Sequence, residues 1–164
     1  MPNWCSNTVV FTGKTENLKA FLLNVYSSTK GVVQEEFNCK LHSENEMYCF
    51  DITCNEIDIS ELTPEAINNF NDTQLVLNYS TRWNPNSYDV LHAAKVYNLD
   101  FEHEYEETSM GIFGKRTFVY NEDEYCGADL KPNDFIKCQD EDGISDYEQL
   151  EKRLSQKMLY PLLH

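Results

Sequence analysis

Residues 74–120 read QLVLNYSTRWNPNSYDVLHAAKVYNLDFEHEYEETSMGIFGKRTFVY, and this stretch decides the fold. Apolar and polar side chains alternate at its start, which predicts a strand over Gln74–Trp83. Asn84-Pro85-Asn86 ends that strand, because proline and its flanking residues favour a turn. Apolar side chains at helical spacing then predict a helix over Tyr88–Tyr97, with Ser87 as its N-terminal cap.

The second half of the stretch predicts two strands, Asp100–Thr108 and Ile112–Tyr120. Ser109-Met110-Gly111 lies between them and predicts a hairpin. A β-α-β-β order of this kind is typical of an α+β domain rather than of a helical bundle.

The flanking sequence adds further elements on both sides. Upstream, the patterns predict a strand over Asn7–Thr12, a helix over Glu16–Ser27, a strand over Met47–Cys54 and a short helix from Thr63 to Asn69. Downstream, residues 121–143 are acidic and loop-like, and Ser145–Leu159 predicts a final helix.

The order of the first six main elements matches the split βαβ pattern of ferredoxin-like domains. We therefore expect an α+β fold with an antiparallel sheet and helices on one face, formed by residues 1–120. Residues 121–164 are expected to form an acidic extension and a C-terminal helix packed on the same domain.

Charge is the unusual property of this chain. The formal net charge is −15, and residues 100–151 hold sixteen acidic but only four basic side chains. A field this negative repels nucleic acid and anionic lipid, and it attracts basic protein surfaces. We expect no direct nucleic-acid binding and no membrane association.

No motif indicates catalysis. The chain lacks a phosphate-binding loop, a nucleotide-binding glycine fingerprint and a nucleophile elbow. Its six cysteines show no CxxC spacing, so we expect free thiols, no bound metal and no cofactor. The first residues lack the pattern of a secretory signal, which favours the cytoplasm. The expectation is a protein that is not an enzyme.

An acidic strand is the most suggestive functional feature. Its carboxylates alternate with Phe101, His103 and Tyr105, so they should share one face at about 6.5–7 Å spacing. That spacing is close to the distance between phosphates along one DNA strand. A solvated sheet face would give the same pattern. The candidate partner-binding residues are Asp100, Glu102, Glu104 and Glu106, extended by Glu122, Asp123 and Glu124.

A second candidate site lies at the turn after the strand that ends near Trp83. Polar and aromatic groups there and on the hairpin could line a small-ligand or nucleotide site. Its candidate residues are Arg82, Trp83, Asn84, Lys115 and Arg116.

Three segments carry a resemblance to a known family: Met1-Pro-Asn-Trp-Cys-Ser-Asn7, Thr81-Arg-Trp-Asn-Pro85 and Gly111-Ile-Phe-Gly114. Over roughly residues 1–27 and 73–120 the chain resembles the YubB-like or Api-type proteins of bacteriophages and plasmids. One departure is Asn86, where the family pattern has a second proline. The resemblance implies a ferredoxin-like domain and a mobile-element setting, and it implies no catalytic residues.

Charge and resemblance together suggest a small phage-type accessory protein that binds another protein. The expected form is a DNA mimic, an inhibitor of a host defence or DNA-processing protein such as a basic nuclease. Binding of a small ligand is the alternative.

Overall fold

The computed structural model of the protein describes residues 4–29, 38–39, 48–51, 63–139 and 146–159. The strands are β1 (Trp4–Thr12), β2 (Asn38–Cys39), β3 (Tyr48–Asp51), β4 (Gln74–Arg82), β5 (Asp100–Glu107), β6 (Ile112–Val119) and β7 (Glu124–Leu130). The helices are α1 (Thr15–Thr29), α2 (Pro64–Asn69), α3 (Ser87–Tyr97), α4 (Pro132–Ile136) and α5 (Tyr147–Leu159).

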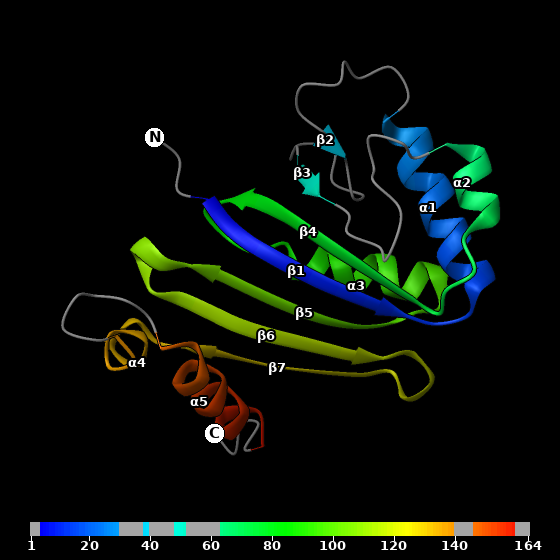
Figure 1. Cartoon of the computed structure of the whole chain (residues 1–164). Coiled ribbons are helices and arrows are strands. Elements are labelled where there is room, and N and C mark those ends of the chain that lie inside the picture. Colours follow the sequence, from blue (N-terminus) through cyan, green and yellow to red (C-terminus); the bar gives the residue numbers. More distant parts are fainter. Residues whose placement is uncertain (1–3, 30–37, 40–47, 52–62, 140–145, 160–164) are drawn as a thin grey trace.

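The strands form one antiparallel sheet in the order β2-β3-β4-β1-β5-β6-β7 (Figure 1). β1 lies between β4 and β5 and is antiparallel to both. β4 and β5 are therefore parallel to each other, and α3 connects them across β1. This split βαβ unit is the ferredoxin-like arrangement that the sequence predicts.

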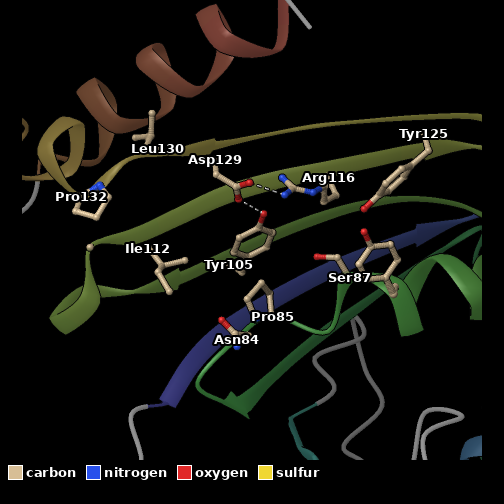
Figure 2. Close-up of a pocket in the computed structure, with 12 residues that line it drawn as sticks. Asn84, Pro85, Ser87, Tyr105, Ile112, Arg116, Tyr125, Asp129, Leu130 and Pro132 are labelled. Carbon is tan, nitrogen blue, oxygen red and sulfur yellow. Dashed lines mark hydrogen bonds and ion pairs between the residues drawn. The ribbon is translucent and has the colours of Figure 1, made fainter. Parts of the chain in front are cut away.

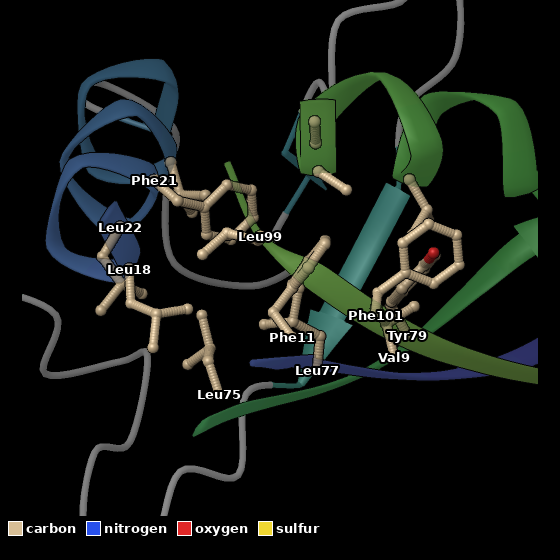
Figure 3. Close-up of a cluster of buried hydrophobic side chains, with 14 of the residues drawn as sticks. Val9, Phe11, Leu18, Phe21, Leu22, Leu75, Leu77, Tyr79, Leu99 and Phe101 are labelled. Carbon is tan, nitrogen blue, oxygen red and sulfur yellow. The ribbon is translucent and has the colours of Figure 1, made fainter. Parts of the chain in front are cut away.

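One face of the sheet is covered by α1 and α3. Alternate side chains of β1 point to this face, so Val9 and Phe11 are fully buried. Phe11 packs against Phe21 of α1, with ring centroids 5.1 Å apart, and against Phe101 of β5 at 6.2 Å. Figure 3 shows how the α1 residues Leu18, Phe21 and Leu22 meet the strand residues in this main core.

A smaller core lies on the opposite face, where α5 packs on β6 and β7 (Figure 1). Phe113 of β6 points there, because it is paired with Glu106 rather than with a residue of the main core. The helices are therefore not confined to one face: α1 and α3 cover one, and α5 covers part of the other. The buried residues of this second cluster are Phe113, Leu130, Cys138, Leu150 and Leu154.

The structure corrects the prediction that residues 121–143 are loop-like for residues 121–139, the part of this segment that it describes. β7 pairs with β6 from Val119↔Glu124 to Phe113↔Leu130, and α4 follows it. Of the β7 side chains only Leu130 is fully buried, so apolar alternation was too weak to reveal the strand. Backbone hydrogen bonds to β6 hold β7 in the sheet instead.

Smaller corrections concern element ends. Ser87 is the first residue of α3 and not its cap; Asn86 holds the cap position, without a side-chain hydrogen bond to the helix. The cap of α2 is confirmed, since Thr63 Oγ1 accepts from the backbone N–H of Ala66 at 3.1 Å. The part of the predicted strand Met47–Cys54 beyond β3 lies outside the described residues.

Candidate functional site

The carboxylates of β5 form a row on the face opposite α1 and α3. We call Asp100, Glu102, Glu104 and Glu106 the acidic row. The intervening Phe101, His103 and Tyr105 are buried on the other face, as the alternation predicts. The side chains of Glu102 and Glu104 are 61% and 47% exposed, so both carboxylates meet solvent.

Lys115 of β6 is the counterion at the centre of the acidic row. Its Nζ lies 2.8 Å from Glu102 Oε2 and 2.8 Å from Glu104 Oε1. Burial lowers the pKa of Lys115, but the hydrogen bonds to these two carboxylates outweigh that effect and raise the pKa overall. One ammonium offsets part of two carboxylate charges, so the row stays negative.

The two ends of the acidic row are held differently. Asp100 Oδ1 accepts from the backbone N–H of Tyr120 at 2.7 Å. At the other end, the Tyr147 hydroxyl of α5 donates to Glu106 Oε1 at 3.2 Å. Both donors are uncharged groups, so these hydrogen bonds orient the Asp100 and Glu106 side chains without adding a counterion.

The β6–β7 turn brings part of the predicted acidic extension next to the row. Glu124 is paired with Val119 and by register shares the face of the acidic row. Asp123 turns toward α3 instead, where its Oδ1 lies 2.8 Å from Lys95 Nζ. Glu122 is exposed in the same turn. The structure thus places Glu124 at the Asp100 end of the row and Glu122 in the adjacent turn, whereas Asp123 forms an ion pair with Lys95.

A cavity of about 450 Å³ opens on the other face, the one that carries α3. Its floor is formed by side chains of β5, β6 and β7, and its opposite wall by the turn into α3 (Figure 2). Figure 2 shows the Tyr105 hydroxyl and the Arg116 guanidinium directed toward Asp129, with Pro85 and Ser87 on the other side of the cavity. The exposed ring of Tyr88 also lines the cavity.

Arg116, Asp129 and Tyr105 form a hydrogen-bonded group on the cavity floor. Arg116 Nη2 donates to Asp129 Oδ2 at 2.6 Å, and Nη1 donates to the Ala128 carbonyl at 2.9 Å. The Tyr105 hydroxyl donates to Asp129 Oδ1. Burial, and then this hydrogen bond, raise the pKa of Tyr105. The group is therefore a fixed pair of opposite charges beside an uncharged phenol.

Two glycines make room for this group. A Cβ at Gly114 would lie 2.4 Å from the Tyr105 ring, and one at Gly127 would lie 2.2 Å from Arg116 Cδ. Any larger residue would push these side chains off the sheet. The absence of two Cβ atoms is what lets Tyr105 and Arg116 lie flat across β6 and β7.

A buried polar network supports the wall of the cavity. His103 is fully buried, with Nε2 2.9 Å from Asn7 Oδ1 and Nδ1 3.2 Å from Ser87 Oγ. Asn7 Nδ2 donates to Thr81 Oγ1, whose hydroxyl donates to the Asn84 carbonyl at 2.7 Å. The network ties the turn before α3 to the centre of the sheet.

The hydrogen bonds of this network match a neutral His103 ring, in which one nitrogen donates and the other accepts. Burial, and then the charge of Arg116, lower its pKa from 6.5 to about 3. Asn7 uses its amide N–H groups on the Cys5 carbonyl and on Thr81, so Asn7 Oδ1 must accept from the His103 ring. Nδ1 of the neutral ring is then left to accept from Ser87.

The structure separates the residues of the second predicted site. Asn84 and Arg116 both line the cavity. Lys115 lies on the opposite face, bound to the acidic row. Trp83 is half-exposed beside the cavity, with a left-handed backbone at φ 69°. The side chain of Arg82 lies outside what the structure describes.

Sequence reasoning missed most of the cavity. Tyr88, Tyr105, Tyr125 and Asp129 line it and were not predicted as site residues. They come from a helix and two strands, and β7 was not recognised as a strand. Gly114 and Gly127 are the signal that could have indicated a close approach of side chains to these strands.

Metal and membrane signatures are absent from the described ranges. In these residues no three His, Cys, Asp or Glu side chains are grouped so that they could hold a metal ion. None of the described helices combines the length and apolarity that crossing a bilayer requires. The described thiols of Cys5, Cys126 and Cys138 are free.

Comparison with known proteins places the fold in a family. A family model described as the ferredoxin-like domain in Api92-like protein matches residues 64–155, more than half of the chain. The matched region contains β5, β6 and β7, and so the acidic row and the cavity floor. Comparisons with curated proteins and with solved structures found no match. The chain therefore belongs to the family of Api92-like proteins that carry this ferredoxin-like domain.

Proposed function

We propose that the protein acts by binding a basic protein through the acidic row. In the proposed form it is an inhibitor that mimics DNA and occupies the nucleic-acid site of a host defence or DNA-processing protein. The resemblance of the chain to phage and plasmid proteins suggests this setting, and the proposal places the protein in the host cytoplasm. It assigns the protein no enzymatic activity.

One observation carries the proposal: four carboxylates share one face of a single strand, with Glu102 and Glu104 exposed and Asp100 and Glu106 partly exposed. A strand fixes their spacing at about 6.5–7 Å, and the pairing of β5 with β1 and β6 holds the row rigidly in the sheet. Rigidity favours binding, because little side-chain or backbone freedom is lost on association. A basic groove that binds phosphates would find a row of negative charges already in place.

The position of Lys115 indicates which part of the acidic row should contact the partner most strongly. Because it bridges Glu102 and Glu104, the centre of the row is less negative than its two ends. The Asp100 end gains Glu124, and the exposed Glu122 lies in the adjacent turn, so negative charge gathers at this end. We expect the strongest contact with the partner at that end.

A binding experiment with a matched control tests the proposal. The protein would be immobilised and exposed to host lysate, and bound proteins would be released by duplex DNA and identified. The test variant changes Asp100 to Asn and Glu102, Glu104 and Glu106 to Gln. The control changes the exposed residues Glu16, Glu65, Glu148 and Glu151 to Gln, which removes the same charge elsewhere.

We expect the wild type and the control to retain a basic nucleic-acid-binding protein that DNA displaces. The acidic-row variant should lose it. Equal recovery by both variants would show that net charge, and not the row, governs binding. A partner that DNA cannot displace would contradict the DNA-mimic form of the proposal.

A second function, the binding of a small ligand, is favoured by a separate observation. The cavity beside Arg116 is of ligand size and lies on the face away from the acidic row. The two functions therefore use different surfaces and can be tested independently.

A further inference from the structure

We propose that the cavity binds the base of a free nucleoside or nucleotide, which it recognises through an aromatic ring and the Arg116–Asp129 pair. This inference concerns the face of the sheet away from the acidic row. It deepens the small-ligand function proposed as the second candidate and does not depend on the protein-binding one.

Size and lining favour a flat aromatic group. The volume of about 450 Å³ is within the usual range for ligand sites. Rings of Tyr88, Tyr105 and Tyr125 line the cavity, and Tyr88 is 83% exposed. So large an exposed ring beside a cavity offers a surface on which a base can stack, and stacking tolerates any base because each has a π-face.

The polar groups on the floor match the edge of a base. Arg116 Nη2 donates one N–H to Asp129 Oδ2 at 2.6 Å. The second N–H of Nη2 and a second lone pair of Oδ2 then remain next to each other as a donor and an acceptor for a ligand. Nucleobase edges present an acceptor next to a donor at comparable spacing. Nη1 of Arg116 is held by the carbonyls of Lys115 and Ala128, so the guanidinium is oriented before any ligand arrives.

The charge balance argues against recognition of a phosphate. Arg116 is the one cationic side chain among the described residues that line the cavity, and Asp129 pairs with it. Lys115 is on the opposite face. The protein as a whole carries −15, which repels an anion. The base, and not the phosphate, should therefore supply the affinity.

The floor of the cavity is flat. Because Gly114 and Gly127 lack a Cβ, the side chains of Tyr105 and Arg116 lie close against β6 and β7, and they line the cavity rather than fill it. A flat floor of this kind suits a planar ring such as a nucleobase.

Titration calorimetry on the intact protein tests the inference with four nucleosides, their monophosphates, inorganic phosphate and N-acetyltryptophanamide. The key variant is Tyr88→Ala, because removal of a largely exposed ring should not disturb folding. Tyr120→Ala is the control: Tyr120 is 38% exposed in the β6–β7 turn and does not line the cavity.

We expect at least one nucleoside to bind saturably, and its monophosphate to bind no more tightly. Tyr88→Ala should weaken binding about tenfold, as the loss of a stacked ring does. Asp129→Asn should change the preference among bases, and Tyr120→Ala should have no effect. The acidic-row variant should bind the nucleoside normally, so failure of one proposal leaves the other intact.

Four results would overturn the inference. No saturable binding by any nucleoside would do so, and so would binding that Tyr88→Ala leaves unchanged. Competition by inorganic phosphate would indicate an anion site instead. Equal binding of N-acetyltryptophanamide would show that any aromatic ring fits and that the base edge is not recognised.

Discussion

Lys115 and Arg116 are consecutive residues of β6, and their cationic groups lie on opposite faces of the sheet. Lys115 Nζ binds Glu102 and Glu104 of the acidic row, whereas Arg116 Nη2 binds Asp129 on the cavity floor. The cause is the two-residue repeat of a strand. One short segment therefore sets the charge of two separate surfaces, and each can be changed without the other.

Replacement of Lys115 by Met should lower the free energy of unfolding modestly, by about 0.5–1 kcal/mol at low salt. Glu102 and Glu104 would then repel each other across the same face without a counterion. Urea denaturation at low and high salt checks this, because salt screens the repulsion and should shrink the difference. Lys152→Met, at an exposed position of α5, is the control. A loss that persists in full at high salt would mean that Lys115 stabilises by packing instead.

The stability of the protein should fall in acid partly through His103. Its pKa is lowered from 6.5 to about 3 in the fold, so between these values the unfolded chain binds a proton that the folded chain does not. The stabilisation is complete above pH 6.5 and is lost as pH falls toward 3, at about 1.4 kcal/mol per pH unit. His103→Gln should flatten this part of the profile, as measured by urea unfolding between pH 7 and pH 4. An unchanged slope would show that His103 does not titrate there.

The Gly127→Ala substitution should destabilise the protein by about 1–3 kcal/mol, because the new Cβ would overlap the Arg116 side chain. It should also abolish nucleoside binding, since Arg116 would leave the floor. Cys126→Ala is a suitable control, because Cys126 is the preceding residue of β7 and points to the other face. Thermal unfolding and calorimetry measure both effects. Normal stability in Gly127→Ala would show that the floor adapts easily.

Trp83 has a left-handed backbone, at φ 69°, which a bulky side chain adopts at a cost. Trp83→Gly should therefore be more stable than Trp83→Ala, by about 1 kcal/mol, because both lose the indole but only glycine relieves the strain. Chemical denaturation of the two variants isolates the backbone effect. Equal stability would indicate that the turn relaxes once the indole is gone.

The sequence predicted those parts of the structure that local patterns encode. Strict alternation over Asp100–Glu107 placed the acidic row on one face, and Thr63-Pro64 marked the start of α2. Such signals depend on neighbours along the chain, so they can be recognised without the fold.

The parts that were missed depend on contacts between distant segments. β7 is a strand because β6 offers it a backbone to pair with, although its own side chains alternate only weakly. Ser87 was predicted as a cap, but its hydroxyl is hydrogen-bonded to His103, which is sixteen residues away in the chain. The cavity arises from the meeting of a turn, a helix and three strands, and no local pattern encodes that meeting.

The position of β7 also determines where this chain can be cut. Every β6 residue from Phe113 to Val119 has a partner in β7, so β6 is an interior strand. A fragment that ended after Tyr120 would leave unpaired those backbone groups of β6 that face β7, and it would expose Phe113, which α5 and β7 otherwise help to cover. Unpaired edges of this kind recruit strands from other molecules. The C-terminal segment thus moves the edge of the sheet from β6 to β7 and covers the apolar surface at Phe113, and shortened versions of the protein should aggregate through β6.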